Sequence, residues 1–234
     1  MILKKIPFIY KICLIIKHSY LSYLTKKSLR TYLKSKKNKC LQVGSGENEL
    51  RGWFNTDFLP RKNIAFLDVT KKFKIPAQSF DYVFSEHHIE HIHYKEATFM
   101  LQELYNIIKK GGVLRICTPD LSKYLKTYFA TDNTKDLYVE DIMNNWIKKG
   151  FHNAKNFVPN EGLENITFFI NDLFYNYEHK FIYDEITLTD LLKATGFRKV
   201  YSCKPSMSAH EPLNGIESHV GITMQYTLVI EAIK

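Results

Sequence analysis

Seven consecutive residues carry the densest group of reactive side chains in the sequence. Ser85-Glu86-His87-His88-Ile89-Glu90-His91 holds two carboxylates and three imidazoles, directly after a short apolar run at 82–84 that is typical of a strand. Imidazoles and carboxylates can exchange protons near neutral pH. We therefore expect acid–base chemistry in this segment, and the position of the segment in the fold decides which side chains reach a substrate.

The same residues also satisfy a metal-binding pattern. His87-His88-Ile89-Glu90-His91 has the H-x-x-E-H spacing of inverted zinc peptidases, in which two histidines bind zinc and the glutamate is the base. That pattern needs a continuous helix, so that side chains three and four residues apart share a face. Because a strand is expected to end at 84 or 85 and no third ligand is evident, a zinc peptidase using His87, Glu90 and His91 remains an alternative, and no metal site is predicted.

Strands and helices alternate along the central part of the chain. Strands are expected at 40–43, 53–57, 64–67, 82–84, 113–117, 198–203 and 224–232, with helices at 95–109, ended by Gly111-Gly112, and from Thr187 to Gly196. Only nine residues separate Val43 from Trp53, which leaves room for a helix of one or two turns. The order predicts an α/β fold: a Rossmann-like, doubly wound, mostly parallel sheet with an antiparallel last strand.

Residues 121–178 interrupt this alternation. They are rich in Tyr, Phe, Asn and Lys and show helical patterns near 121–129 and 139–146. We interpret them as a helical insertion that caps the carboxyl edge of the sheet. Their aromatic side chains are interpreted as the core of this cap.

The positive charge of the chain is concentrated at one end. Residues 1–39 contain eleven of the 33 lysines and arginines and no acid, so the rest of the chain has a slight excess of acid. Pro7 and the spacing of Ile6, Ile9, Cys13, Ile16, Tyr20 and Leu24 predict a basic amphipathic helix within residues 1–38, separate from a domain at 39–234. Two interpretations stay open: the helix packs on the domain with its basic face in solvent, or it lies on an anionic membrane surface. Nucleic acid is disfavoured as a partner, because the rest of the chain offers no basic groove.

The compartment can be predicted from the cysteines and the first apolar run. Four cysteines lie far apart with no CxxC pair, which predicts free thiols in a reducing compartment. The run at 6–16 is interrupted by Lys11, is too short to span a bilayer, and precedes no small-residue cleavage site. We expect a cytoplasmic protein, peripheral at the inner membrane surface under the second interpretation of the helix.

Four motifs, in this order, resemble those of class I S-adenosylmethionine-dependent methyltransferases. They are Leu41-Gln42-Val43-Gly44-Ser45-Gly46, Gly52-Trp53-Phe54-Asn55-Thr56-Asp57, Ser79-Phe80-Asp81-Tyr82-Val83-Phe84-Ser85-Glu86-His87 with Glu90-His91, and Leu104-Tyr105-Asn106-Ile107-Ile108-Lys109-Lys110-Gly111-Gly112-Val113-Leu114. The resemblance spans roughly residues 39–234. Within that family the chain is similar to small bacterial enzymes with a His-Lys-Phe-x-Tyr-Asp block, many of which act in surface-polysaccharide metabolism. It implies S-adenosylmethionine as cofactor and a small-molecule or glycan-type acceptor, methylated at oxygen.

The resemblance also implies roles for particular residues. Gly44, Ser45 and Gly46 would line the methionine and ribose of the cofactor, Asp57 would bind the ribose hydroxyls, Asp68 would lie near the adenine, and Ser85 would contact the cofactor after the fourth strand. Glu86, His87 and His91 would face the methyl group and are the catalytic candidates, whereas His88 and His93 are expected in solvent.

Two positions depart from the family pattern. Gln42 stands where many members have an acid, and Asn48 stands where a third glycine would be. These departures, with the basic terminal segment, leave open a second hypothesis: a catalytically silent, membrane-associated module that binds the cofactor without turnover.

Overall fold

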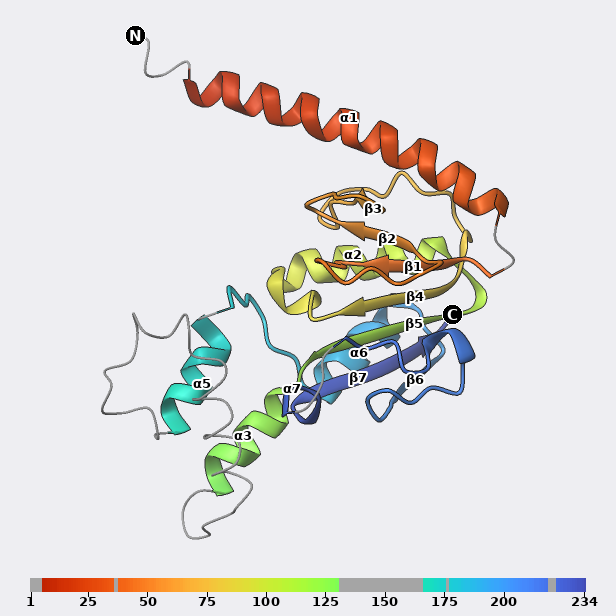
Figure 1. The fold of residues 1–234 in the computed structure, drawn as a ribbon. Coiled ribbons are helices and arrows are strands. Elements are labelled where there is room, and N and C mark those ends of the chain that lie inside the picture. Colours follow the sequence, from red (N-terminus) through yellow and green to blue (C-terminus); the bar gives the residue numbers. More distant parts are fainter. Residues whose placement is uncertain (1–5, 36–37, 131–165, 176, 219–221) are drawn as a thin grey trace.

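One seven-stranded sheet organises the molecule, whose computed structural model describes residues 6–35, 38–130, 166–175, 177–218 and 222–234. The strand order is β3-β2-β1-β4-β5-β7-β6 (Figure 1). The strands are β1 Cys40–Val43, β2 Phe54–Asp57, β3 Ile64–Phe66, β4 Phe80–Glu86, β5 Ile108–Pro119, β6 Lys199–Ser202 and β7 Thr227–Ile233. β7 runs antiparallel to both of its neighbours, β5 and β6, and all other strand pairs are parallel. The predicted Rossmann-like α/β fold with an antiparallel last strand is confirmed.

The two faces of the sheet are covered differently in the described residues. The helices are α1 Ile6–Ser35, α2 Tyr94–Ile107, α3 Leu121–Ala130, α5 Ile166–Tyr175, α6 Glu185–Thr195 and α7 Ile222–Gln225, with short 3-10 turns η1 Ile89–His91 and η3 Glu211–Leu213. Side chains from α2 and α6 form the main core with one face of the strands, on which Val83 and Leu114 lie. On the other face Phe84 and Val113 meet loop residues such as Leu213. Successive strand residues point to opposite faces, so each strand contributes to both layers.

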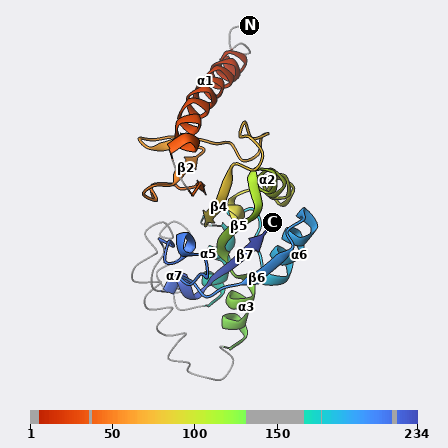
Figure 2. The same cartoon turned by 90° about the vertical axis from the view of Figure 1, so that its right-hand side faces the viewer.

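Helix α1 is joined to the sheet through its C-terminal half. Leu29 is 2% exposed and belongs to the main core. The Thr25 hydroxyl donates to the Phe66 carbonyl at 3.0 Å, and the Tyr32 hydroxyl donates to the Cys40 carbonyl at 2.9 Å. The N-terminal half diverges from the sheet and extends past the carboxyl ends of the strands (Figures 1 and 2).

The apolar stripe predicted in this helix is not the face that packs on the sheet. Cys13, Ile16, Tyr20 and Leu24 are all exposed. The side chains of Ile6 and Ile9 lie outside the described part of the structure.

Several local predictions differ from the structure. No helix occurs between β1 and β2, where residues 44–53 form turns. Helix α2 ends at Ile107 instead of Lys109, because Ile108 already pairs with Phe80 in the sheet. Asp184, and not Thr187, caps α6, since its carboxylate accepts the Thr187 amide hydrogen bond at 2.8 Å. Of the predicted insertion, α3 and α5 are described, and the helix expected at 139–146 falls outside the described residues.

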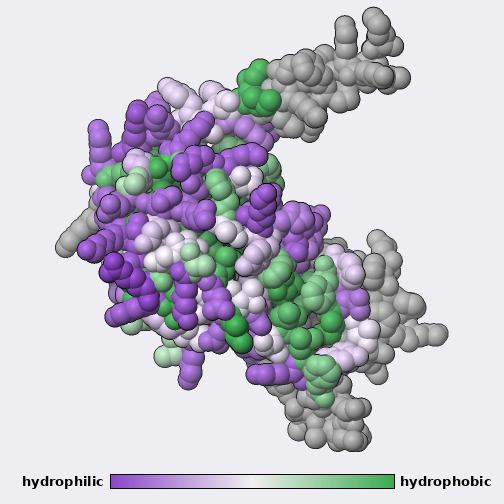
Figure 3. All heavy atoms as spheres, turned by 180° about the vertical axis from the view of Figure 1, so that it is seen from behind, coloured by the Kyte–Doolittle hydropathy of each residue, from purple (hydrophilic) through white to green (hydrophobic). Residues whose placement is uncertain are grey.

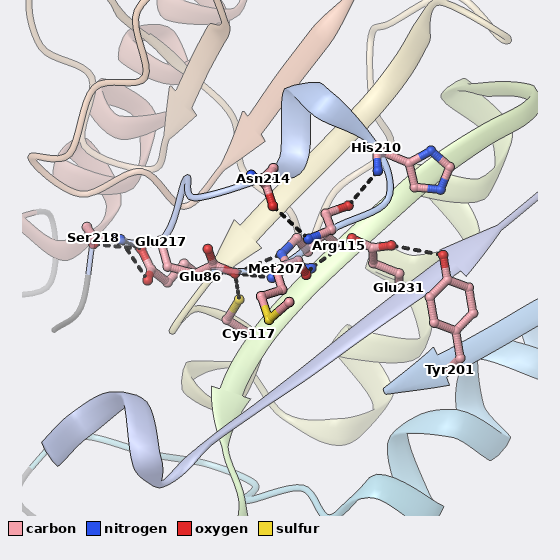
Figure 4. A network of polar contacts seen from close by, with 11 residues as sticks. Glu86, Arg115, Cys117, Tyr201, Met207, His210, Asn214, Glu217, Ser218 and Glu231 are labelled. Atoms are coloured by element: carbon pink, nitrogen blue, oxygen red, sulfur yellow. Dashed lines mark hydrogen bonds and ion pairs between the residues drawn. The ribbon is translucent and has the colours of Figure 1, made fainter. Parts of the chain in front are cut away.

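A buried ion-pair network fastens residues 204–218 to the loop-covered face of the sheet (Figure 4). Arg115 on β5 is fully buried and donates to the carboxylates of Glu217, at 2.8 Å, and Glu231, at 2.7 Å, and to the Met207 carbonyl at 3.1 Å. Tyr201 donates to the second oxygen of Glu231 at 2.9 Å. Burial is the largest single influence and would lower the pKa of Arg115, but the hydrogen bond and charge of Glu217, a smaller interaction with Cys117 and the hydrogen bond with Glu231 together outweigh burial and raise the pKa. Arg115 therefore stays charged and neutralises two buried carboxylates.

Replacing Arg115 should destabilise the fold strongly. The change Arg115→Ala leaves two carboxylates buried without a cation, and loss of one partner of a buried ion pair costs about 3–5 kcal/mol. Lys109→Ala is the matched control, since Lys109 pairs with Asp81 at 2.8 Å but is partly exposed, and such pairs contribute about 1 kcal/mol or less. Urea unfolding of both variants measures the difference. Equal losses in the two variants would contradict this account of the network.

Candidate functional site

The predicted glycine loop and the predicted acid lie together at the carboxyl ends of β1 and β2. Gly44 and Gly46 have φ angles of +67° and +55°, a region that glycine adopts without a steric penalty. The Ser45 amide donates to the Thr56 carbonyl at 3.0 Å, and the Gly46 amide donates to the Asp57 carboxylate at 2.9 Å. The fold thus joins the loop after one strand to the acid at the end of the next.

A cluster of buried polar atoms without partners lies at this edge. In the described part of the chain five buried side-chain atoms lack a hydrogen-bond partner, and three of them are Ser45 Oγ, Ser85 Oγ and His88 Nδ1. Val43 pairs with Ser85 across β1 and β4, and a Cβ added to Gly44 would lie 2.2 Å from the His88 ring. Buried polar groups in native proteins nearly always have partners. These three atoms therefore indicate a ligand with polar groups of its own.

His88 differs from its predicted position in solvent. The residue is half-buried, its Nδ1 is fully buried, and the ring packs against Gly44. Burial lowers the pKa of His88, so the imidazole is neutral near pH 7. His93 is exposed, as predicted.

Glu86, one of the three catalytic candidates, is engaged by another part of the chain. Both of its carboxylate oxygens accept hydrogen bonds from Ser218, from the amide at 3.0 and 3.1 Å and from the hydroxyl at 2.6 Å (Figure 4). The Ser218 hydroxyl also accepts from the Asn48 amide group at 2.9 Å. Glu86 therefore anchors residues 217–218 over the end of β4 and ties them to the glycine loop.

His87, the second candidate, lies between a carboxylate and a hydroxyl. Its Nδ1 is 3.1 Å from Glu90 Oε1, and its Nε2 is 3.2 Å from the Thr227 hydroxyl at the start of β7. A left-handed φ of 45° at His87 turns the chain out of β4 before η1 begins. His87, Glu90 and His91 thus do not share a continuous helix, which removes the geometry that the zinc-peptidase hypothesis requires.

Glu90 is a fully buried carboxylate that orients His87. Its second oxygen accepts from the Thr118 hydroxyl at 3.1 Å, and its backbone carbonyl accepts from the amides of Lys180, at 2.7 Å, and Phe181, at 3.2 Å. Burial is the largest single influence and tends to raise the pKa of Glu90, but the hydrogen bond and charge interaction with His87, together with smaller contributions, outweigh it and the pKa is lowered. An ionised Glu90 fixes the proton of His87 on Nδ1 and leaves Nε2 as the acceptor.

His91, the third candidate, is exposed and points to a different segment. Its ring centroid lies 4.8 Å from that of His179. Ligand atoms of Glu90, His91 and His179 all lie within 4.8 Å of one another. Because both Glu90 oxygens already accept hydrogen bonds, we assign this carboxylate to His87 and assign no metal to the group.

Asp68 makes a local turn beside α1. Its Oδ1 accepts from the amide of Thr70 at 3.0 Å and from the Thr70 hydroxyl at 2.6 Å. The residue also lines a cavity of about 250 Å³, whose other walls include His18, Lys26 and Phe66. The role of Asp68 toward an adenine ring stays a prediction.

Five aromatic side chains in the described part of the insertion are exposed and do not form the predicted core of the cap, whereas Tyr124 is partly buried against Tyr226. Tyr128 and Phe129 on α3, Phe174 and Tyr175 on α5 and the following Tyr177 are 40–73% exposed. Exposed aromatic rings offer flat apolar contact surfaces to a ligand. Sequence composition had indicated the aromatics but could not show which side of the helices they occupy.

The family comparison agrees with this arrangement. Residues 41–116 match the family model described as a methyltransferase domain. The matched segment contains the glycine loop, Asp57, Ser85 and His87. The domain match and the fold support an S-adenosylmethionine-dependent methyltransferase, with S-adenosylmethionine as its methyl donor.

Solved structures with a similar chain path are distant in sequence. A methyltransferase from Thermotoga maritima has 15% identity over 94% of this chain and 96% of its own, at a TM-score of 0.44. A methyltransferase from Archaeoglobus fulgidus has 17% identity over 91% of this chain and 94% of its own, at a TM-score of 0.47. A phosphoethanolamine N-methyltransferase from Haemonchus contortus has 13% identity over 89% of this chain and 53% of its own, at a TM-score of 0.43. No curated protein sequence matches the chain. At these scores the likenesses do not bear on activity.

Burial of His88 should make stability depend on pH. The pKa of His88 in the folded protein is below the ordinary 6.5. Below pH 6.5 the unfolded chain therefore binds more protons than the folded chain, and the free energy of unfolding decreases as the pH is lowered. One such group contributes at most about 1.4 kcal/mol per pH unit. His88→Asn should reduce this slope, whereas His93→Asn, at an exposed site, should not. Urea unfolding at several pH values measures it, and an unchanged slope in His88→Asn would refute the assignment.

Proposed function

We propose that this protein transfers the methyl group of S-adenosylmethionine to a hydroxyl of a small-molecule or glycan-type acceptor. The observation that carries the proposal is the pairing of His87 with buried Glu90 at the edge where Ser45, Ser85 and His88 present partnerless polar atoms. The His87–Glu90 pair suits removal of a hydroxyl proton, and the partnerless polar atoms suit binding of a polar cofactor. We further propose a cytoplasmic location, since the four cysteines lie far apart in the sequence with no CxxC pair.

The residues at the strand ends fit the cofactor. Asp57 lies at the end of β2 and can accept both ribose hydroxyl protons, since its carboxylate has four lone-pair sites for the two backbone amides it already holds. The hydroxyls of Ser45 and Ser85 and the neutral His88 ring would serve the amino-acid and ribose portions. The positive φ at Gly44 and Gly46 brings backbone close to a ligand where a side chain would collide.

His87 is proposed as the general base. The sulfonium cofactor supplies an electrophilic methyl group, so the protein has to position the acceptor oxygen in line and remove its proton. Glu90 holds the imidazole with Nε2 as acceptor, and Nε2 already meets one hydroxyl, that of Thr227, at 3.2 Å. An acceptor hydroxyl bound there would pass its proton to Nε2, and ionised Glu90 would stabilise the resulting imidazolium.

The acceptor class rests on the family resemblance and on the exposed aromatic side chains of α3 and α5. Aromatic faces suit sugar rings and other flat partly apolar surfaces. Incubation with methyl-labelled cofactor and fractionated cell extract identifies the class directly. We expect label in small molecules or glycans, and label only in RNA or protein would contradict the proposal.

Ser85→Ala tests the cofactor site. Removal of a hydroxyl that has no partner in the protein should leave stability unchanged or slightly raised, but should weaken binding of S-adenosylhomocysteine by about tenfold. Ser79→Ala is the matched control at the other end of β4, where the hydroxyl donates to the Pro76 carbonyl at 2.7 Å. This variant should lose about 1 kcal/mol of stability and keep its affinity. Calorimetry and thermal unfolding give both quantities, and equal affinities in the two variants would overturn the assignment.

His87→Asn and Glu90→Gln test the base. Loss of a positioned base should lower turnover by about 10²–10⁴-fold with cofactor affinity preserved. The labelled-methyl assay with the identified fraction measures both variants. Full turnover in His87→Asn would contradict the role, and cofactor binding without any transfer by the unmodified protein would leave only the silent binding module.

A further inference from the structure

Helix α1 has two faces that the structure treats differently. The inner face carries His18, Thr25, Leu29 and Tyr32, which contact the sheet or the aromatic rings beside it. The outer face carries Ile16, Tyr20 and Tyr23, which are 62%, 61% and 64% exposed. Within each face, neighbouring members are three, four or seven residues apart, and this spacing places them on one side of a helix. The outer apolar residues have therefore been left without cover by the fold.

The same outer face is basic in the C-terminal half of the helix. Lys27, Arg30 and Lys34 continue the spacing of Ile16, Tyr20 and Tyr23, and all three are exposed. Residues 1–39 contain no acid that could neutralise them. Figure 3 shows a small exposed hydrophobic patch on α1, and mostly hydrophilic residues cover the surface beside it. One face thus combines an apolar half, which favours leaving water, with a cationic half.

We propose that this outer face of α1 docks on an anionic phospholipid bilayer surface. Ile16, Tyr20 and Tyr23 would enter the boundary between headgroups and acyl chains, and Lys27, Arg30 and Lys34 would meet lipid phosphates. None of the described helices is long and apolar enough to cross a membrane, so the helix would lie in the interface. The inner face remains on the sheet, which keeps the catalytic domain attached to the docked helix.

Charge and composition favour a bilayer over other occupants. Pairing with a second copy of this face would bring two cationic surfaces without acids together, which is repulsive. A nucleic acid would satisfy the cations but would offer no apolar environment to Ile16. An anionic bilayer supplies both the phosphates and the apolar boundary.

Sedimentation of the full-length protein with lipid vesicles tests the proposal. We expect binding to vesicles of phosphatidylcholine and phosphatidylglycerol in equal amounts, little binding to phosphatidylcholine alone, and weaker binding as salt is raised. Ile16→Ser with Tyr20→Ser, and separately Lys27→Glu with Arg30→Glu and Lys34→Glu, should each weaken partitioning by about tenfold or more. All five side chains are exposed, so folding should be retained, which circular dichroism checks.

Matched controls separate this face from general stickiness. Ile186→Ser removes another exposed apolar residue, 72% exposed on α6, and Lys95→Glu with Lys193→Glu and Lys199→Glu reverses three exposed cations of the domain. These variants should bind vesicles as the unmodified protein does. Equal losses in controls and test variants, equal binding to neutral vesicles, or binding of RNA without vesicle binding would overturn the proposal. Cofactor affinity is unaffected in every case, so failure here leaves the proposed methyl transfer standing.

Discussion

The buried carboxylate of Glu90 is the interaction on which the candidate site depends. It accepts hydrogen bonds from His87 and from Thr118 of β5, and the Glu90 carbonyl holds the amides of Lys180 and Phe181. Through His87 the same group reaches Thr227 of β7. A buried charge is stable only when such partners are present. The side chain and the backbone carbonyl of this one residue therefore hold together four segments that are distant in sequence, and the imidazole of His87 is left with a single orientation.

The edge next to Glu90 has the opposite character, because its polar groups are not satisfied by the protein. Ser45, Ser85 and His88 keep buried atoms without partners. Arg115, by contrast, forms ion pairs with Glu217 and Glu231 that fix residues 204–218 on the sheet, although the second carboxylate oxygen of Glu217 also has no partner among the described residues. Buried polar groups that the protein leaves without partners lower its stability unless a ligand completes their hydrogen bonds. The grouping of three such atoms supports the proposal that the cofactor binds at the ends of β1 and β4.

The sequence allowed the sheet to be predicted because alternating apolar runs and turn signals are local. The joining of Gly46 to Asp57 followed from the shared carboxyl edge of parallel strands. Other features depend on contacts between distant residues. Ser218 binds Glu86 across 132 positions, and the burial of His88 requires the glycine at position 44. The left-handed turn at His87, which replaces a helical H-x-x-E-H arrangement with a His–Glu pair, has no periodic signal, and neither does the rotation of α1 that turns Ile16 and Tyr20 outward.

A crystal structure of the full-length protein with S-adenosylhomocysteine tests the central claim most directly. The account predicts the ligand at the carboxyl ends of β1 and β4, with Asp57 at its ribose hydroxyls and its polar atoms within hydrogen-bond distance of Ser45, Ser85 or His88. The Nε2 of His87 should face the position of the transferred methyl group. A ligand bound elsewhere, such as in the cavity between α1 and Asp68, would contradict the account. Absence of binding at a ligand concentration of about 1 mM would also contradict it, because most cofactor sites bind more tightly than that.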